Sequence, residues 1–434
     1  MTTFDEILPK LAAIFQRHPD VASIAPILVN RDLNGRVRLI MDEKWETNPA
    51  ARAELDAIAR EARDALGPHA HSAEQMLMFE PNIEGSITEE SAFPLEDCAG
   101  INVVDRLAME GDWAKITPPL TTAQRIVFFS IKGGVGRSTA LAATAWVLAE
   151  RGERVLVLDM DLESPGLSSS LLPQDRRPAY GIADWLVEDL VDNSELVFAD
   201  MVATSELSRN GDILVVPAHG KDPGEYLSKL GRVWMSKAGR NGQRESWPER
   251  LRRLLDRVEE RWRPSVVLID SRAGIDEAAS ACLTGLGAST ILLFAIDGDQ
   301  TWTGYRMLFR HWRKAGRVRE IRERLQIVGA MIPETGADKY FEELRERAWD
   351  AFADELYDEI PAGAILSEGD SWSFDQSDES APHYPWAVRW HRGFAALQSL
   401  HGKLSVIGRD EINAVFGPLI EGVMASVEID RDAV

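Results

Sequence analysis

The sequence predicts an α/β fold in which helices flank a mostly parallel β-sheet. Between residues 124 and 333, apolar runs of four or five residues alternate with helical patterns, and this alternation is typical of a parallel sheet covered on both faces. The runs are almost continuously apolar, as expected of strands whose two faces are both buried. A small α+β module is expected before this region and a helical extension after it.

Six apolar runs that end in loop residues are the expected strands of this sheet. They are Ile126–Phe129, Val155–Leu158, Ile213–Val216, Val266–Ile269, Ile291–Ala295 and Ile327–Met331. Apolar residues at helical spacing lie between the runs, and the helices expected there include Thr139–Glu150, Glu249–Glu260, Asp276–Leu286 and Thr303–Trp312.

The 434 residues are long enough for two to three domains. We expect an N-terminal α+β module at 1–115 and a linker at 116–124, because two consecutive prolines break both helix and strand there. The main domain is expected at 125–400 and a C-terminal helical extension at 401–434. After residue 334 the pattern is mostly helical, interrupted by a polar loop at Glu368–Pro385.

Within the N-terminal module, two apolar runs, Val21–Val29 and Val37–Met41, flank a polar segment that resembles a hairpin turn. Further helices and short strands complete the expected module. They are the helices Phe4–Gln16 and Ala50–Leu66 and the strands Gln75–Phe79 and Ile101–Val104.

The composition restricts the location of the protein and its possible chemistry. The two cysteines, Cys98 and Cys282, are far apart, so neither a zinc site nor a disulfide framework is indicated. Such cysteine usage fits a reducing cytosol. No apolar stretch approaches the ~18 residues of a membrane-spanning helix, and the first residues lack the apolar core of a signal peptide. We therefore expect a cytoplasmic protein without a membrane partner.

The net charge of -22 is concentrated in the two ends of the chain. Residues 1–120 carry -10 and residues 334–434 carry -13, whereas the region between them is nearly neutral at +1. Nonspecific binding to nucleic acid requires positive charge that displaces counterions. The overall charge therefore makes nucleic acid an unlikely partner, although a local basic face is not excluded by it.

A glycine-rich loop follows the first expected strand and leads into a helix. It reads Lys132-Gly133-Gly134-Val135-Gly136-Arg137-Ser138-Thr139. Glycines allow backbone N–H groups to curl around phosphate oxygens, and the helix N-terminus adds partial positive charge. Ser138 stands where a hydroxyl would ligate Mg²⁺. An ordinary glycine-rich turn is the alternative, but the strand–loop–helix context favours a phosphate-binding loop.

The loop resembles the KGGVGK[ST]T signature of the ParA/MinD family, the deviant Walker A P-loop ATPases of the SIMIBI class. The resemblance covers about residues 124–400 and is strongest to a subgroup with KGGVGR. It implies that the loop binds ATP with Mg²⁺ and that Lys132 reaches the partner's phosphates across an ATP-dependent homodimer. Arg137 replaces the usual P-loop lysine. Arginine keeps the charge and binds phosphate in a bidentate manner, so nucleotide binding is expected and the hydrolysis rate stays open.

Two acidic strand ends extend the resemblance. Asp159-Met160-Asp161 resembles the D-x-D of the family, in which the residue matching Asp161 positions the attacking water and the one matching Asp159 lies near Mg²⁺. Asp270 matches the carboxylate that holds Mg²⁺ through water. Gly274 would allow the backbone to approach the γ-phosphate.

The residue types around the base and the second acidic strand leave alternatives open. Arg272 stands where the family usually has proline, and it is either a phosphate sensor or a structural ion pair. No guanine motif is present, which favours ATP over GTP. Pro333 and the loop His383-Tyr384-Pro385 could pack on the base, and ordinary loop structure is the simpler interpretation.

Several branches of the family do not fit. The cysteines do not match those of iron–sulfur electron donors, the C-terminus lacks the basic amphipathic helix of division regulators, and the tyrosine-rich tail of bacterial tyrosine kinases is missing. DNA partition is tested by the arginine-rich segment Arg306–Arg324, which is either a phosphate-contacting face or a face that is solvated or docks on an acidic part of the chain. We favour the second interpretation.

The resemblance to KGGVGR proteins implies a role with a partner effector, possible contexts being bacterial conflict and anti-phage defence. The predicted function is an ATP-binding, ATP-hydrolysing, dimerising switch that regulates a partner protein through residues 1–115. The alternatives are a nucleotide-binding scaffold with little turnover and a DNA-partition-type motor.

Overall fold

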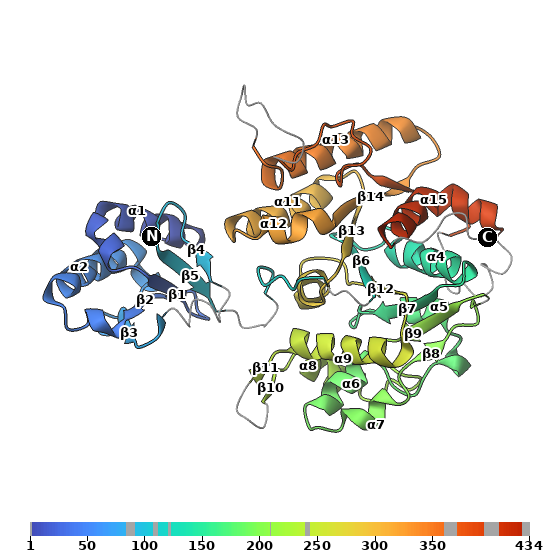
Figure 1. Ribbon diagram of the computed structural model, residues 1–434, viewed down its shortest axis with the longest axis horizontal. Helices are drawn as coiled ribbons and strands as arrows, with labels where there is room; N and C mark the ends of the chain where they lie inside the picture. The colour runs from blue at the N-terminus through green and yellow to red at the C-terminus, as the bar shows by residue number, and fades with distance from the viewer. Residues whose placement is uncertain are drawn as a thin grey trace. The chain divides into compact units, whose positions relative to one another are not determined.

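The computed structural model describes residues 2–83, 92–106, 112–119, 123–208, 210–238, 244–359, 371–394 and 408–427 (Figure 1). The chain divides into two compact units. The first consists of residues 1–109 with the short segment 314–317, and the second contains the remaining residues. Within the described ranges, no helix combines the length and the apolar character needed to cross a bilayer.

The first unit is built on a five-stranded sheet with strand order β3-β2-β1-β5-β4. Its strands are β1 (Ile27–Arg31), β2 (Val37–Asp42), β3 (Leu77–Glu80), β4 (Phe93–Pro94) and β5 (Ile101–Asp105). β1 and β2 form the expected antiparallel hairpin, but β1 begins only at Ile27 because Pro19–Ser23 is a 3₁₀ turn. The α+β character predicted for this module is therefore confirmed.

Two helices, α1 (Ile7–Arg17) and α2 (Pro49–Leu66), bury their apolar sides against one face of this sheet. The start of α2 follows from its sequence, because the Asn48 side chain accepts hydrogen bonds from the amides of Ala50 and Ala51 and a proline occupies the first helical turn. The predicted helix Ala50–Leu66 differs from α2 by one residue.

The second unit contains an eight-stranded sheet with strand order β15-β14-β13-β6-β12-β7-β9-β8. All neighbouring strands are parallel except β8 and β9. This confirms the predicted mostly parallel sheet. The strands are β6 (Gln124–Ser130), β7 (Arg154–Asp159), β8 (Ala203–Thr204), β9 (Asp212–Val216), β12 (Val266–Asp270), β13 (Thr290–Ala295), β14 (Leu325–Ile332) and β15 (Trp386–Arg389).

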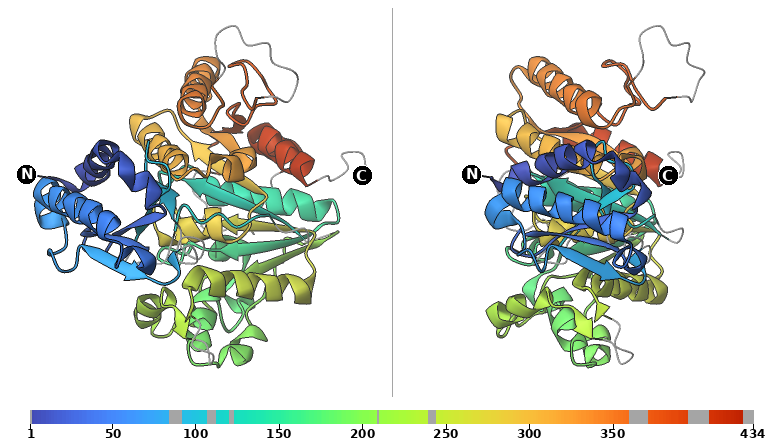
Figure 2. Two further views of the ribbon diagram at one scale, coloured as in Figure 1. Left: turned by 60° about the vertical axis from the view of Figure 1, so that its left-hand side comes forward. Right: turned by 90° about the vertical axis from the view of Figure 1, so that its left-hand side faces the viewer.

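Helices cover both faces of this sheet (Figures 1 and 2). Alternate residues of the central strands pack with α4 (Arg137–Glu150), α5 (Leu167–Leu171) and α15 (Arg409–Ser426) on one face. The residues between them pack on the other face with α6 (Ile182–Asp189), α7 (Ser194–Phe198), α9 (Trp247–Trp262), α11 (Asp299–Lys314) and α13 (Ala337–Glu355). Smaller elements are α8 (Tyr226–Val233), α10 (Glu277–Ser280), α12 (Val318–Ile321) and the hairpin of β10 (Lys237–Ala238) and β11 (Arg244–Glu245).

Two sequence expectations need correction. The helix expected at Asp276–Leu286 is α10 followed by a π-helical turn, Ala281–Gly285. The region after residue 334 is not only helix and loop, since β15 adds a parallel edge strand to β14. β15 has only four residues, and so short a pattern does not predict a strand whose pairing partner is distant in the sequence. Residues 120–122 of the expected linker, 368–370 of the polar loop, and 401–407 and 428–434 of the expected extension lie outside the described residues.

The order of the strands locates the functional edge of the sheet. β12 and β13 follow each other along the chain, but in the sheet they lie on opposite sides of β6. Connections therefore diverge at the carboxyl end of β6, and ligands of open α/β sheets bind at such a switch point. The glycine-rich loop begins at this end of β6.

Candidate functional site

The glycine-rich loop joins β6 to α4. Gly134 and Gly136 have φ angles of +76° and +81°, a left-handed conformation that glycine adopts without steric cost. Gly136 is the N-terminal cap of the 14-residue helix α4. The first amides of a helix have no partners within it, and its N-terminus carries partial positive charge. The loop therefore has the backbone geometry of a phosphate-binding site.

Arg137 occupies the centre of the buried part of the site. Its Nε donates to Asp270 Oδ1 at 2.8 Å and its Nη1 donates to Ser130 Oγ at 3.0 Å. The side chains of Arg137 and Asp270 are 8% and 1% exposed. Burial lowers the pKa of Arg137, but the charges of Asp270, Asp161 and Asp159 outweigh burial and raise it. The guanidinium is thus a fixed cation beneath the loop.

Ser138 and Asp270 form a side-chain hydrogen bond. Ser138 Oγ donates to Asp270 Oδ2 at 2.6 Å, so both oxygens of Asp270 have partners. The adjacent strands β12 and β7 place Asp270 and Asp159 in register. The two strand ends that the sequence marked by their carboxylates therefore lie side by side, and Asp270 reaches the first residues of α4.

Asp159 is turned toward the loop that follows β7. Its Oδ2 accepts from the amide of Ser168 at 3.0 Å and from its hydroxyl at 2.6 Å, whereas Oδ1 is buried without a hydrogen-bond partner among the described residues. Burial and, secondly, the charge of Asp270 raise the pKa of Asp159 to about 7. Asp161 is less buried, and its Oδ1 accepts from the amide of Ser164 at 3.2 Å.

The three predicted metal ligands, Ser138, Asp159 and Asp270, can be tested as a Mg²⁺ site by the partners of their oxygens. Mg²⁺ takes oxygen ligands in octahedral geometry and retains several waters. Here the oxygens of Asp270 accept from Arg137 and Ser138, and Asp159 is fully buried. Ser138 Oγ keeps its lone pairs when it donates to Asp270, but Asp270 is held by a buried guanidinium and Asp159 is closed to water. As arranged, the two carboxylates do not fit a hydrated Mg²⁺, and we assign it no step.

Lys132 and Gly274 lie at the outer part of the site. Lys132 is exposed, as a residue that reaches another molecule must be. Gly274 has a φ of +98°, and its amide donates to the carbonyl oxygen of Ser130 at 2.9 Å. The predicted approach of Gly274 to a γ-phosphate would therefore require this hydrogen bond to open.

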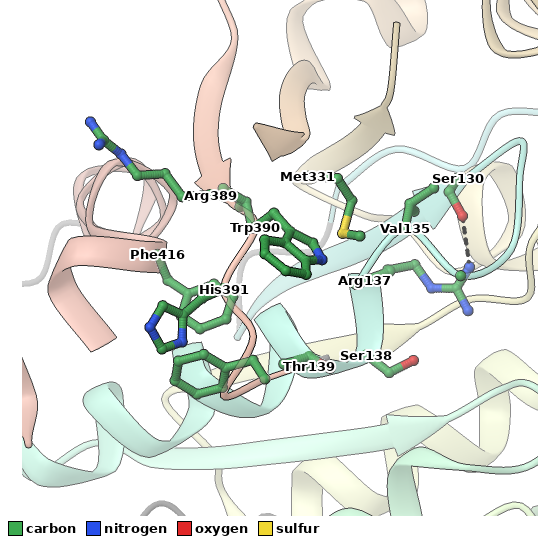
Figure 3. A pocket seen from close by; sticks show the side chains of 14 residues that line it. Ser130, Val135, Arg137, Ser138, Thr139, Met331, Arg389, Trp390, His391 and Phe416 are labelled. Carbon is green, nitrogen blue, oxygen red and sulfur yellow. Dashed lines mark hydrogen bonds between the residues drawn. The ribbon is translucent and has the colours of Figure 1, made fainter. Parts of the chain in front are cut away.

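A pocket of about 360 Å³ opens beside the loop. Figure 3 shows Trp390 and Met331 facing this loop, while Arg137 extends away from them toward Ser130. Trp390 is 37% exposed, and its amide donates to Ile332 O at 2.8 Å. Besides the loop residues Gly134–Thr139 and Ser130, the lining residues are Met331, Val388, Arg389, Trp390, His391, Phe394 and Phe416.

The aromatic wall of this pocket was not predicted from the sequence. Trp390 follows β15, the strand that the sequence did not predict, so no pattern marked its position. Pro333 directly follows β14 but is not among the lining residues. His383 is fully buried, with its nitrogens 2.5 Å from Tyr357 Oη and 3.2 Å from Gln376 O. The ordinary structural interpretation of the 383–385 loop therefore agrees with the structure.

The arginine-rich segment docks on acidic residues of the same unit. Arg310 Nε donates to Glu355 Oε1 at 3.0 Å, and Arg313 Nε lies 3.1 Å from Glu355 Oε2. Arg306 pairs with Asp354, and Arg322 pairs with Asp358 at 2.7 Å. The interpretation that we favoured from the sequence was a face that is either solvated or docked on an acidic part of the chain, and these contacts support docking.

The strand–loop–helix geometry and the parallel sheet define a P-loop type of nucleotide-binding protein. Residues 126–371, more than half of the chain, match the model of the CobQ/CobB/MinD/ParA nucleotide-binding domain. The chain therefore belongs to this family, which confirms the predicted ParA/MinD-like P-loop fold. The assignment of its loop to the deviant Walker A type stays a prediction.

Individual relatives match more narrowly. The chain is 39% identical over 67 residues to the "Putative arsenical pump-driving ATPase 1" of Aquifex aeolicus, a match that spans 15% of this chain and 17% of that protein. The ParA family ATPase of Chlorobium tepidum is similar with 16% identity, 69% and 98% coverage of the two chains and a TM-score of 0.43. The cell division ATPase MinD of Pyrococcus furiosus is similar with 19% identity, 70% and 99% coverage and a TM-score of 0.42.

Proposed function

We propose that this protein is an ATP-binding, dimerising molecular switch. The observation that carries the proposal is the glycine-rich loop, with two left-handed glycines at the N-terminus of α4, opening on a pocket of about 360 Å³. The phosphates bind the loop amides, and the base lies against Trp390. Ligand pockets of this kind combine apolar walls with a few placed polar groups.

The wall of the pocket supports ATP rather than GTP. Besides the loop, the described lining residues carry no carboxylate or amide side chain. Both bases carry one amino group, but guanine also has a ring N1–H that needs an acceptor, and an unsatisfied buried donor costs about 1–3 kcal/mol. Stacking on an aromatic ring accepts either purine, so the N1–H of guanine, which finds no carboxylate or amide acceptor on the described wall, provides the preference for adenine.

Hydrolysis is the second part of the proposal. Asp161 lies after β7, less buried than Asp159, and is positioned by the amide of Ser164; it orients the attacking water. Arg137 and Lys132 stabilise the charge that develops on the phosphates. The ion pair of Arg137 with Asp270 favours slow turnover. The same contact therefore supports, as a second candidate, a nucleotide-binding scaffold with little turnover.

Measuring ATP binding and ATP turnover together tests these candidates. We expect wild type to bind ATP and to hydrolyse it slowly, and Asp161→Ala to bind with similar affinity but to lose turnover. Equal, negligible turnover of both proteins with retained binding would support the scaffold and exclude the enzyme. Absence of ATP binding would refute both.

Dimerisation and partner regulation complete the proposal. Lys132 is exposed and bridges to the phosphates of a second copy. Light scattering with a non-hydrolysable ATP analogue should show a dimer that Lys132→Ala weakens, and a monomer at every concentration would contradict this role.

Residues 1–115 recognise a partner effector, in an anti-phage system by the resemblance of the loop. If so, a protein recovered with the full chain from its native cell should change in amount between the ATP-loaded and nucleotide-free states.

A further inference from the structure

Arg137 stands beside the carboxylate of Asp270, where a metal bound to Asp270 would lie. Its guanidinium donates to one carboxylate oxygen at 2.8 Å, and Ser138 donates to the other at 2.6 Å. A divalent cation that ligated Asp270 would stand within a few ångströms of a buried guanidinium of the same sign. Either Arg137 leaves, or Asp270 does not ligate the metal.

Departure of Arg137 is opposed by its surroundings. Its side chain and that of Asp270 are 8% and 1% exposed, and removing one member of a buried ion pair leaves an uncompensated charge. Ser130, which is fully buried, accepts a second hydrogen bond from the same guanidinium at 3.0 Å. A lysine in this position has one compact ammonium and cannot hold both contacts in the planar geometry of a guanidinium.

The guanidinium retains donors for a ligand. Its contacts use Nε and Nη1, and Nη2 has no hydrogen-bond partner among the described residues. Guanidinium binds phosphate through two parallel N–H groups. Arg137 is the first residue of α4, at the end where the loop amides lie, and it lines the pocket although its guanidinium extends toward Ser130. A phosphate on the loop amides would therefore meet the free Nη2 of this cation.

We infer that Arg137 takes the place of the divalent metal in this site, bridging Asp270 to the nucleotide phosphates, so that ATP binds without Mg²⁺. The inference rests on the proposed function, since it concerns how the same pocket holds ATP. Asp159 does not supply an alternative ligand, because it is fully buried and its Oδ2 is held by Ser168.

The test is the dissociation constant of ATP in Mg²⁺ and in EDTA, measured by calorimetry on the full chain. For wild type we expect a change of less than about threefold between the two buffers. For Arg137→Lys we expect ATP affinity to fall more than about tenfold in EDTA, because a lysine leaves an Asp270 oxygen open to metal. A wild type that weakens more than about tenfold in EDTA, or an Arg137→Lys protein as insensitive as wild type, overturns the inference.

Ser138→Ala provides a second variant that does not disturb the ion pair. Whatever its affinity for ATP, we expect the ratio between the two buffers to equal that of wild type. A loss of affinity seen only in Mg²⁺ would identify Ser138 as a metal ligand and overturn the inference, and this arm decides alone if Arg137→Lys does not fold. No binding of ATP in either buffer would instead refute the proposed function.

Discussion

Arg272 connects the two loops that follow the acidic strand ends β7 and β12. Its Nη1 pairs with Glu163, and its Nε lies 3.3 Å from Asp276 Oδ2. Glu163 belongs to the loop that begins with Asp161, and Asp276 caps α10 by accepting from the amide of Ala279 at 2.9 Å. Of the two roles open from the sequence, these contacts favour the structural ion pair.

The coupling between Arg272 and Glu163 is therefore measurable as stability. In a double-mutant cycle with Arg272→Ala and Glu163→Ala, we expect an interaction free energy of about 0.5–1 kcal/mol, small because both side chains are partly exposed. Denaturant unfolding of the four proteins gives the value. Additivity of the two substitutions to within about 0.3 kcal/mol would show that the pair contributes no stability.

Trp390 offers a stacking surface for the base of the nucleotide. Base–aromatic stacking contributes about 1–3 kcal/mol, so Trp390→Ala should weaken ATP binding by about tenfold or more, and Trp390→Phe should retain most of the affinity. Anisotropy of a fluorescent ATP analogue measures both. The same assay should show ATP bound more tightly than GTP, because the described wall has no carboxylate or amide side chain to accept the N1–H of guanine.

Trp372→Phe is a matched control for this experiment. Trp372 packs against Tyr357 and Phe374 and is not among the residues that line the pocket. We expect its substitution to leave ATP affinity unchanged. Equal losses in the Trp372 and Trp390 variants would indicate a general effect on folding, and an unchanged affinity of Trp390→Ala would exclude the stacking role.

Glu355 holds the arginine-rich face of α11 by accepting from Arg310 and approaching Arg313. Its side chain is 2% exposed, so Glu355→Gln should lower the free energy of unfolding by about 1–3 kcal/mol. Glu342 lies at an exposed position of α13, the helix that ends at Glu355. Glu342→Gln should therefore change the free energy of unfolding by less than about 0.5 kcal/mol. Denaturant unfolding distinguishes these outcomes.

The same contacts predict how the protein behaves toward DNA. Because these arginines are engaged within the unit, ATP-loaded wild type should show no salt-sensitive binding to duplex DNA at ~100 mM salt in a filter-binding assay. Binding that falls steeply with added salt would contradict the internal docking role and restore the DNA-motor hypothesis.

The parts of this protein that follow from local sequence were predictable. The β6 strand, the loop Lys132–Thr139 and helix α4 share one strong signal, since apolar periodicity and glycine placement reinforce each other. The carboxylates Asp159 and Asp270 follow buried strands, and parallel strands bring their carboxyl ends to one edge. Their approach beside the loop was therefore predictable from the fold class alone.

The parts that depend on distant contacts were not predictable. Trp390 lies in the pocket only because β15 pairs with β14, and four residues carry no reliable strand signal. The hydrogen-bond partners of the two buried carboxylates were not predictable either. Asp270 prefers Arg137 and Ser138, and Asp159 prefers Ser168, because burial of several charges in a small volume forces pairings that spacing alone does not specify.

Asp159 should make the stability of the second unit depend on pH. Burial, followed by the charge of Asp270, raises its pKa from 3.8 to about 7 in the folded protein, so the folded state binds this proton more tightly than the unfolded state does. The resulting stabilisation is complete below the unfolded pKa and is lost as pH rises through about 7.

Asp159→Asn retains an acceptor for Ser168 but cannot ionise. Between about pH 5 and pH 8, wild type should therefore lose stability relative to Asp159→Asn by up to a few kcal/mol. Thermal unfolding of both proteins across this range measures the effect, and a difference that does not change with pH would contradict a buried carboxyl that ionises near neutrality.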